Sequence, residues 1–155
     1  MQFVVYGEPK AKGRPRFRTV GKFTQAYTDK ETTNYENLVK LCFINSGCEA
    51  YLNDEPLRCC ITLYKSIPTS ASKKKQNQMA NKEIRPTGKP DLDNCIKSIL
   101  DGLNKVAFKD DKQIVELCCS KYYDYSPRAE IFIEKIGGVE NEWIFRLWNF
   151  IRIRK

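Results

Sequence analysis

The sequence predicts a small single domain of the α/β (α+β) class. Its 155 residues, 41% of them hydrophobic, suffice for one hydrophobic core and are too few for two. Short segments rich in β-branched and aromatic residues alternate with segments whose apolar residues recur every three or four positions. Because the first pattern is typical of strands and the second of helices, both kinds of element are expected around that core.

Four segments have the composition of β-strands. Residues 3–6 are short, β-branched and aromatic, and residues 57–64 alternate and are β-rich. Residues 113–123 and 128–136 follow, with apolar positions in imperfect alternation. Because Tyr125-Ser126-Pro127 supplies a turn between them, the last two strands are predicted to pair as a hairpin.

Two segments before residue 90 have helical character. Residues 28–45 place apolar side chains three and four positions apart, with Thr28 or Asp29 as the cap and Gly47 closing the helix. Residues 70–80 are polar throughout and predict a short basic helix. That helix either faces phosphate groups or is merely exposed to solvent.

The chain is strongly basic, with a formal net charge of +8. Six cations near the N-terminus fall within thirteen residues that contain no acid: Lys10, Lys12, Arg14, Arg16, Arg18 and Lys22. Prolines and glycines between them discourage a helix, so we expect an extended basic loop with Phe17 and Phe23 nearby. Such a loop suits contact with phosphate backbones, although a merely solvated loop is the alternative.

Several classes of function are excluded by what the sequence lacks. It has no histidine, which removes Ser-His-Asp and Cys-His hydrolases and nucleases with an imidazole base. Its seven cysteines include no C-x-x-C pair, so they are expected to be buried, reduced thiols rather than zinc ligands. No phosphate-binding glycine motif, signal peptide or membrane-spanning run is present, so we expect a cytoplasmic protein with no membrane partner.

Carboxylates concentrate between residues 89 and 116 of this basic chain: Asp91, Asp93, Asp101, Asp110 and Asp111. Apolar residues at helical spacing after Pro90 predict a helix with Asp91 at its N-cap, where unpaired backbone N–H groups attract negative charge. Along that helix Asp93 and Lys97 lie four residues apart. An acidic cluster framed by cations is what a protein needs to hold a hard divalent cation against a polyanion.

A magnesium site is one interpretation of these carboxylates. Asp91 and Asp93 can converge with Asp111 if the helix packs beside the strand that begins near residue 113, and Mg²⁺ prefers such oxygen ligands. Lys97 would then offset charge on the phosphoryl oxygens of a substrate. The spacing alone fits a solvated helix face equally well, with Asp101 as an ion-pair partner.

Three segments, in order, resemble the signature segments of the RusA-type Holliday junction resolvases. They are residues 7–16 (GEPKAKGRPR), residues 89–94 (KPDLDN) together with Lys97, and residues 105–114 (KVAFKDDKQI). The resemblance spans roughly residues 3 to 135. In this family the loop before the first aspartate is arginine-rich in some members, whereas residues 85–90 here are RPTGKP.

The resemblance implies a small endonuclease with a mixed β-sheet flanked by helices, found in bacteria and often carried by phages or prophages. It implies cleavage of four-way (Holliday) DNA junctions by paired symmetric nicks, in recombination and repair, with Mg²⁺ as cofactor and Mn²⁺ as a substitute. The family's essential aspartates fall on Asp91, Asp93 and Asp111, and its essential lysine on Lys97. Asp110 is a neighbouring candidate ligand.

The resemblance also implies a homodimer that binds branched DNA. A four-way junction is close to twofold symmetric, so two identical sites related by a twofold axis suit paired nicks. Contacts with DNA are expected from the basic residues Lys10, Lys12, Arg14, Arg16, Arg18 and Lys89.

Two other functions and one further segment stay open. Pro90-Asp91 with Asp110-Asp111-Lys112 also imitates the PD-(D/E)xK nuclease pattern, in which Lys112 would be catalytic instead of Lys97. A non-catalytic nucleic-acid-binding protein with solvated aspartates is the other alternative. Beyond the domain at 1–136, residues 137–155 are apolar and basic, and we expect this extension to pack on the core or on the dimer partner.

Overall fold

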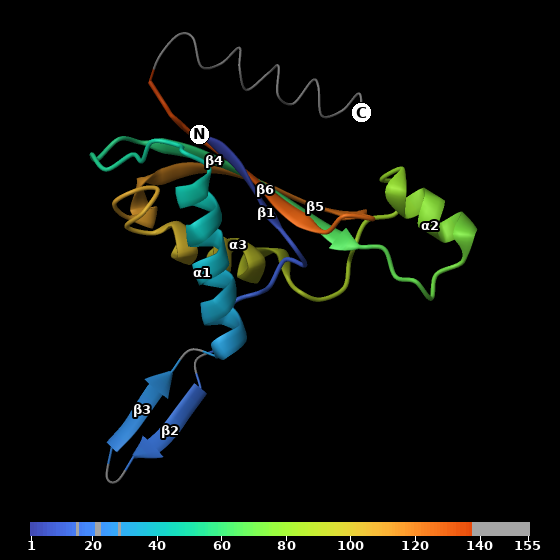
Figure 1. Cartoon of the computed structure of the whole chain (residues 1–155), viewed down its shortest axis with the longest axis horizontal. Helices are drawn as coiled ribbons and strands as arrows, with labels where there is room; N and C mark the ends of the chain where they lie inside the picture. Colours follow the sequence, from blue (N-terminus) through green and yellow to red (C-terminus); the bar gives the residue numbers. More distant parts are fainter. Residues whose placement is uncertain (15, 21–22, 28, 138–155) are drawn as a thin grey trace.

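The computed structural model of the chain (Figure 1) describes residues 1–14, 16–20, 23–27 and 29–137. A four-stranded sheet carries helices, and a separate two-stranded hairpin projects from it. The elements in chain order are β1 (Gln2–Tyr6), β2 (Arg16–Val20), β3 (Phe23–Tyr27), α1 (Lys30–Asn45), β4 (Leu57–Ser66), α2 (Lys73–Ala80), α3 (Leu92–Leu103), a 3₁₀ turn η1 (Asp111–Gln113), β5 (Ile114–Asp124) and β6 (Arg128–Lys135).

The main sheet has the strand order β1-β6-β4-β5 and is mixed. Strand β4 runs parallel to β5 and antiparallel to β6, which in turn pairs antiparallel with β1. This arrangement confirms the predicted small α+β domain. Among the described residues no helix has the length and apolar character that crossing a membrane requires.

The predicted hairpin between β5 and β6 is wrong, because β4 lies between these two strands. Leu57 and residues 59–64 of β4 are buried, so this strand needs a neighbour on each edge. The short connection from β5 to β6 therefore passes the end of β4, where Ile67 N donates to Asp124 O at 3.2 Å. Asp124 also accepts from the Arg128 guanidinium at 3.0 Å, which holds the turn together.

The hydrophobic core lies between the sheet and the helices α1 and α3 (Figure 1). Both helices confirm the predicted spans, with Asp29 and Asp91 at their N-caps. They approach each other closely at Gly102 of α3, where an added Cβ would lie 2.7 Å from the carbonyl oxygen of Glu36 and 3.1 Å from Cβ of Val39. Only glycine permits this contact without moving a backbone.

The basic segment was predicted to be an extended loop, and this prediction is confirmed only as far as residue 14. Strands β2 and β3 follow and pair antiparallel, with Arg18 opposite Gln25 and Val20 opposite Phe23. Runs of β-prone residues on both sides of Gly21 were the sequence signal for this hairpin, and the many cations between them obscured it. Lys22 and the extension 138–155 lie outside the described residues, as do the side chains of Arg16 and Arg18.

The predicted polar helix is present as α2, and it begins at Ser72, whose hydroxyl accepts from the Lys75 amide at 3.4 Å. It lies beyond one end of the sheet, on the opposite side of the molecule from the β2–β3 hairpin (Figure 1). Met79 is its one buried residue. The helix therefore contributes little to the core and presents its lysines to solvent.

The close approach at Gly102 predicts a stability change. Gly102→Val should lower the free energy of unfolding by about 1–3 kcal/mol, because α1 and α3 must move apart. Gly88→Val is the matched control, since nothing lies within 4 Å of its added Cβ, and it should change the stability by less than about 0.5 kcal/mol. Urea denaturation followed by circular dichroism measures both, and equal stabilities would contradict the close contact.

Candidate active site and nucleic-acid interface

The loop that leads into α3 is held by two lysines from the parallel strand pair. Lys65 Nζ, near the end of β4, donates to Lys89 O at 2.7 Å. Lys121 Nζ of β5 donates to Gly88 O at 3.0 Å and to Pro90 O at 2.9 Å. Each ammonium thus satisfies backbone carbonyls that would otherwise face solvent. The start of α3 is consequently fixed to the sheet.

A third basic side chain ties the same loop to β5. Arg85 Nε donates to the carbonyl oxygen of Lys121 at 2.8 Å, and its guanidinium lies 3.7 Å from the ring centroid of Tyr122. Tyr122 stacks on Tyr64 of β4 with 5.9 Å between centroids. Contact between a guanidinium and an aromatic face is attractive, so the loop is held at both ends.

Two carboxylates and a lysine are displayed at the start of α3. Asp91 is the N-cap residue, yet its side chain makes no capping hydrogen bond, and Asp93 lies in the first turn. Both side chains are exposed, as is Lys97 one turn further along. Unpaired N–H groups at this helix end attract anions. Because they are exposed, the carboxylates of Asp91 and Asp93 offer hard oxygen ligands of the kind that Mg²⁺ prefers.

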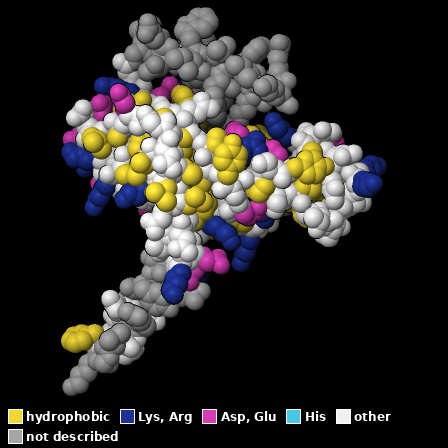
Figure 2. Space-filling view, viewed as in Figure 1, with side chains coloured by type: hydrophobic (Ala, Val, Ile, Leu, Met, Phe, Trp, Pro, Cys, Tyr) yellow, Lys and Arg dark blue, Asp and Glu magenta, His cyan; other side chains and the backbone are white. Residues whose placement is uncertain are grey.

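Asp91 borders a cleft of about 720 Å³ whose charged residues are mostly basic. Five cations line it together with the carboxylates Asp91 and Glu8: Lys10, Lys12, Arg14, Lys65 and Lys89. Figure 2 shows Lys and Arg side chains beside acidic ones where the hairpin leaves the body of the molecule. A carboxylate next to such a group of cations suits a site where a metal ion and a polyanion meet.

Lys12, one of the predicted DNA contacts, is already engaged within the chain. Its Nζ pairs with Asp101 of α3 and, at 3.2 Å, with Glu36 of α1. Burial alone would lower the pKa of Lys12, but the hydrogen bonds to these carboxylates raise it above the ordinary value. Lys12 N also donates to Asn94 O at 2.9 Å. Lys12 therefore anchors the basic segment, and Asp101 is an ion-pair partner, although its partner is Lys12 and not a residue of its own helix.

Asp110 caps the 3₁₀ turn that carries Asp111. Its carboxylate accepts from Lys112 N at 3.1 Å, and this backbone hydrogen bond lowers the pKa of Asp110. The side chain of Gln113, which is buried, accepts in return from Asp110 N at 3.1 Å and from Lys109 N at 2.8 Å. Asp110 thus has a structural role in holding the turn, which leaves Asp111 exposed beside it.

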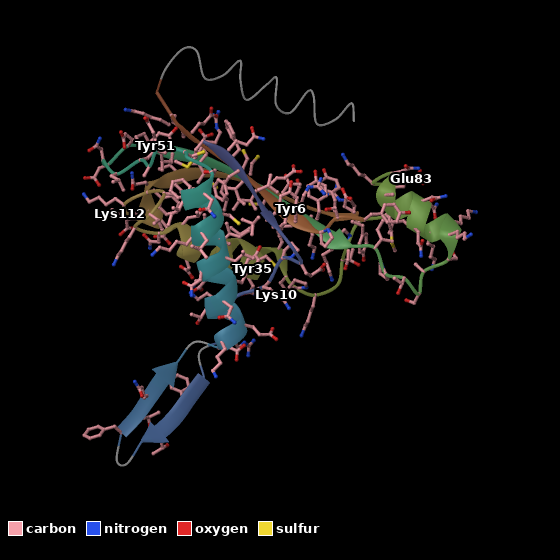
Figure 3. The ribbon with its side chains drawn as sticks, viewed as in Figure 1. Tyr6, Lys10, Tyr35, Tyr51, Glu83 and Lys112 are labelled. Carbon is pink, nitrogen blue, oxygen red and sulfur yellow. The ribbon has the colours of Figure 1, made fainter. Side chains whose placement is uncertain are left out.

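Asp111 is not brought to Asp91 and Asp93 within one chain. It precedes the start of β5, whereas the loop before Asp91 is bound by Lys121, seven residues after Ile114. At about 3.3 Å per strand residue, about 23 Å of β5 separates Ile114, next to the turn of Asp111, from Lys121, which binds the loop of Asp91. Figure 3 shows Lys112, next to Asp111, on a different side of the molecule from Lys10 of the cleft. Among the described residues no three Cys, Asp or Glu side chains form a metal-binding group.

Comparison of the sequence with known proteins shows the family of the chain. Residues 6–134 match the family described as Endodeoxyribonuclease RusA. This chain belongs to the RusA family. YqaN of Bacillus subtilis (strain 168) is 34% identical over 140 residues, which cover 89% of this chain and 98% of YqaN. The crossover junction endodeoxyribonuclease rusA of Lactococcus phage r1t is 30% identical over 131 residues, covering 84% of this chain and 86% of that protein.

Membership of the RusA family makes this chain an endodeoxyribonuclease, in agreement with the prediction from its motifs. The sequence did not single out Lys65 and Lys121 as parts of the site. The sequence alone held no signal for Lys121: only the register of the sheet, which places it opposite the buried Leu63, shows that it occupies an inward-facing position of a strand. A lysine there needs acceptors, and the loop carbonyls provide them.

The clamp on the loop predicts a catalytic effect. Lys121→Met keeps the aliphatic stem and removes the ammonium that holds Gly88 and Pro90, so single-turnover DNA cleavage should slow by about 10- to 100-fold. DNA affinity should change by less than about threefold, because the substitution displaces the Asp91 carboxylate and leaves the residues that bind DNA in place. Lys74→Met removes the same charge from the exposed face of α2 and serves as control. Equal effects of both variants would show that only net charge matters.

Proposed function

We propose that this chain is a magnesium-dependent endonuclease that resolves four-way DNA junctions by paired symmetric nicks, as a homodimer, in recombination and repair. The observation that carries the proposal is the Asp91 carboxylate in a cleft lined by five cations. Support for the junction as substrate comes from the Lactococcus phage relative, which is named a crossover junction endodeoxyribonuclease. Support for a metal comes from the exposed, uncapped oxygens of Asp91 and the nearby Asp93.

The residues of the cleft have separate tasks in this proposal. Asp91 and Asp93 hold Mg²⁺, or Mn²⁺ in its place. When bound, the ion supplies a Lewis acid that polarises the scissile phosphate and lowers the pKa of an attacking water. Lys97 stabilises negative charge that develops on the phosphoryl oxygens. Arg14 and Lys89 bind flanking phosphates of the DNA backbone.

The homodimer completes the ligand set. Because about 23 Å of β5 lies between Ile114, next to the turn of Asp111, and Lys121, which binds the loop of Asp91, one chain alone supplies only Asp91 and Asp93 to its metal. The partner subunit's Asp111 is the third ligand. A twofold axis then creates two equal sites, each with carboxylates from both chains, and two equal sites give two matched nicks.

The first test measures the substrate and the lysine. Purified protein should nick a synthetic four-way junction at symmetric positions in Mg²⁺, should leave a linear duplex and a single strand intact, and should do nothing in EDTA. Asp93→Asn and Lys97→Ala should each slow cleavage by about 100-fold or more, whereas Lys112→Ala should leave it within about threefold. Loss of cleavage in the Lys112 variant alone would favour the PD-(D/E)xK alternative. Junction binding without any cleavage by wild type would instead favour a binding protein.

The second test asks whether the sites are shared. Asp93→Asn and Asp111→Asn homodimers should both be inactive. When the two variants are co-expressed, some dimers contain one chain of each kind. If the sites are shared, one site of such a mixed dimer carries both substitutions and the other site carries neither. Mixed dimers should therefore regain single nicks at up to about half the wild-type rate per dimer. If every site were built from one chain, mixed dimers would stay inactive.

A further inference from the structure

The β2–β3 hairpin does not extend the main sheet, so the stability of that sheet does not account for its presence. Its strands pair only with each other, and Figure 1 shows the hairpin beyond the start of α1, away from the main sheet. It nevertheless carries two large aromatic side chains that are mostly exposed, Phe17 at 70% and Phe23 at 80%. An isolated two-stranded hairpin is marginally stable in water, and rings that are mostly exposed bury little apolar surface within it. These rings are available to a ligand.

The base of the hairpin is anchored next to the proposed catalytic carboxylates. The Lys12 amide donates to Asn94 O, in the first turn of α3 beside Asp93, at 2.9 Å. The next amide, that of Gly13, donates to Thr32 Oγ1 of α1 at 3.0 Å. Two consecutive hydrogen bonds to two different helices fix the direction in which the chain leaves the cleft. The segment that leads to the hairpin is therefore fixed as far as Gly13, beside the first turn of α3 that carries Asp93.

The positive charge of the segment that contains the hairpin favours a polyanion as its ligand. The segment from Lys10 to Gln25 contains six basic and no acidic residues, and Lys10 and Arg14 line the same cleft as Asp91. DNA bound with a backbone phosphate at Asp91 would thus continue along a positively charged surface toward the hairpin. Five residues per strand extend about 17 Å. That length exceeds the depth of either DNA groove, about 8 Å, so the hairpin can reach the base pairs.

We propose that Phe17 and Phe23, which the strand register places on opposite faces of the hairpin, stack on the bases exposed at the branch point of a four-way junction, and that these contacts distinguish branched from linear DNA. The inference rests on the proposed function of the cleft. In a linear duplex every base pair is covered by its neighbours, whereas stacking is interrupted where four arms meet. Aromatic side chains stack favourably on such open base faces, and apolar wedges also hold kinked steps apart.

Binding measured in EDTA, without cleavage, tests this inference. Phe17→Ala/Phe23→Ala removes both rings, and Thr19→Ala/Thr24→Ala changes an exposed cross-strand pair of the same hairpin as control. Fluorescence anisotropy with a labelled junction and a linear duplex of matched sequence gives both affinities. The phenylalanine variant should bind the junction about tenfold or more weakly and the duplex within about twofold. The threonine variant should bind both like wild type, and Phe17→Trp/Phe23→Trp should retain the preference for the junction.

A base analogue and a mass measurement complete the experiment. A 2-aminopurine placed at the branch point should change its fluorescence when wild type binds, and this change should be absent with Phe17→Ala/Phe23→Ala. An equal loss of junction and duplex affinity overturns the inference, because the rings would then add only general affinity. A changed mass of the phenylalanine variant in analytical ultracentrifugation also overturns it, since the hairpin would then be a subunit contact.

These outcomes are separable from the fate of the proposed function. If wild type cuts no DNA but prefers junctions, and the phenylalanine variant loses that preference, the role of the hairpin stands and the resolvase activity fails. If the phenylalanine variant cuts and binds junctions with unchanged preference, the resolvase activity stands and the role of the hairpin is overturned.

Discussion

The site depends on two ammonium groups that bind backbone carbonyls of one loop. Lys65 and Lys121 lie on neighbouring parallel strands and reach the same stretch, residues 88–90, immediately before α3. That stretch contains glycine and proline and has no regular structure of its own. Without the two lysines the stretch would keep only the contacts of Arg85 with β5 and the packing of α3 to orient Asp91. The parallel pairing of β4 and β5 therefore brings both lysines to the loop that precedes Asp91.

Ion pairing divides the basic residues into two groups with different roles. Lys12 is neutralised locally by Asp101 and Glu36, and its contacts join the basic segment to α1 and α3. Arg14 and Lys89 line the cleft and are exposed. Cations and carboxylates thus line the same cleft, which is where the proposed function requires a polyanion and a divalent cation to meet.

Sequence periodicity predicted the helices and the main-sheet strands because their local patterns determine them. Helix α3 follows from its apolar stripe and from Asp91 at its N-cap, and the buried run of β4 indicates a strand. Pairing partners could not be predicted in this way, since nothing local in β5 or β6 shows that β4 lies between them. The clamp was missed for a similar reason: Lys121 resembles a solvated lysine until the sheet register places it opposite Leu63.

The rigid mounting of Asp111 has a kinetic consequence for a nuclease with shared sites. The turn that carries it is capped by Asp110 and tied by the buried Gln113, whose amide reaches Glu55 O at 3.2 Å, so Asp111 stays far from the Asp91 of its own chain. If the sites are shared as proposed, a lone subunit has no complete set of metal ligands and does not cut DNA. Below the dimer dissociation constant the cutting rate would rise with the square of protein concentration, so dilution itself would switch the enzyme off.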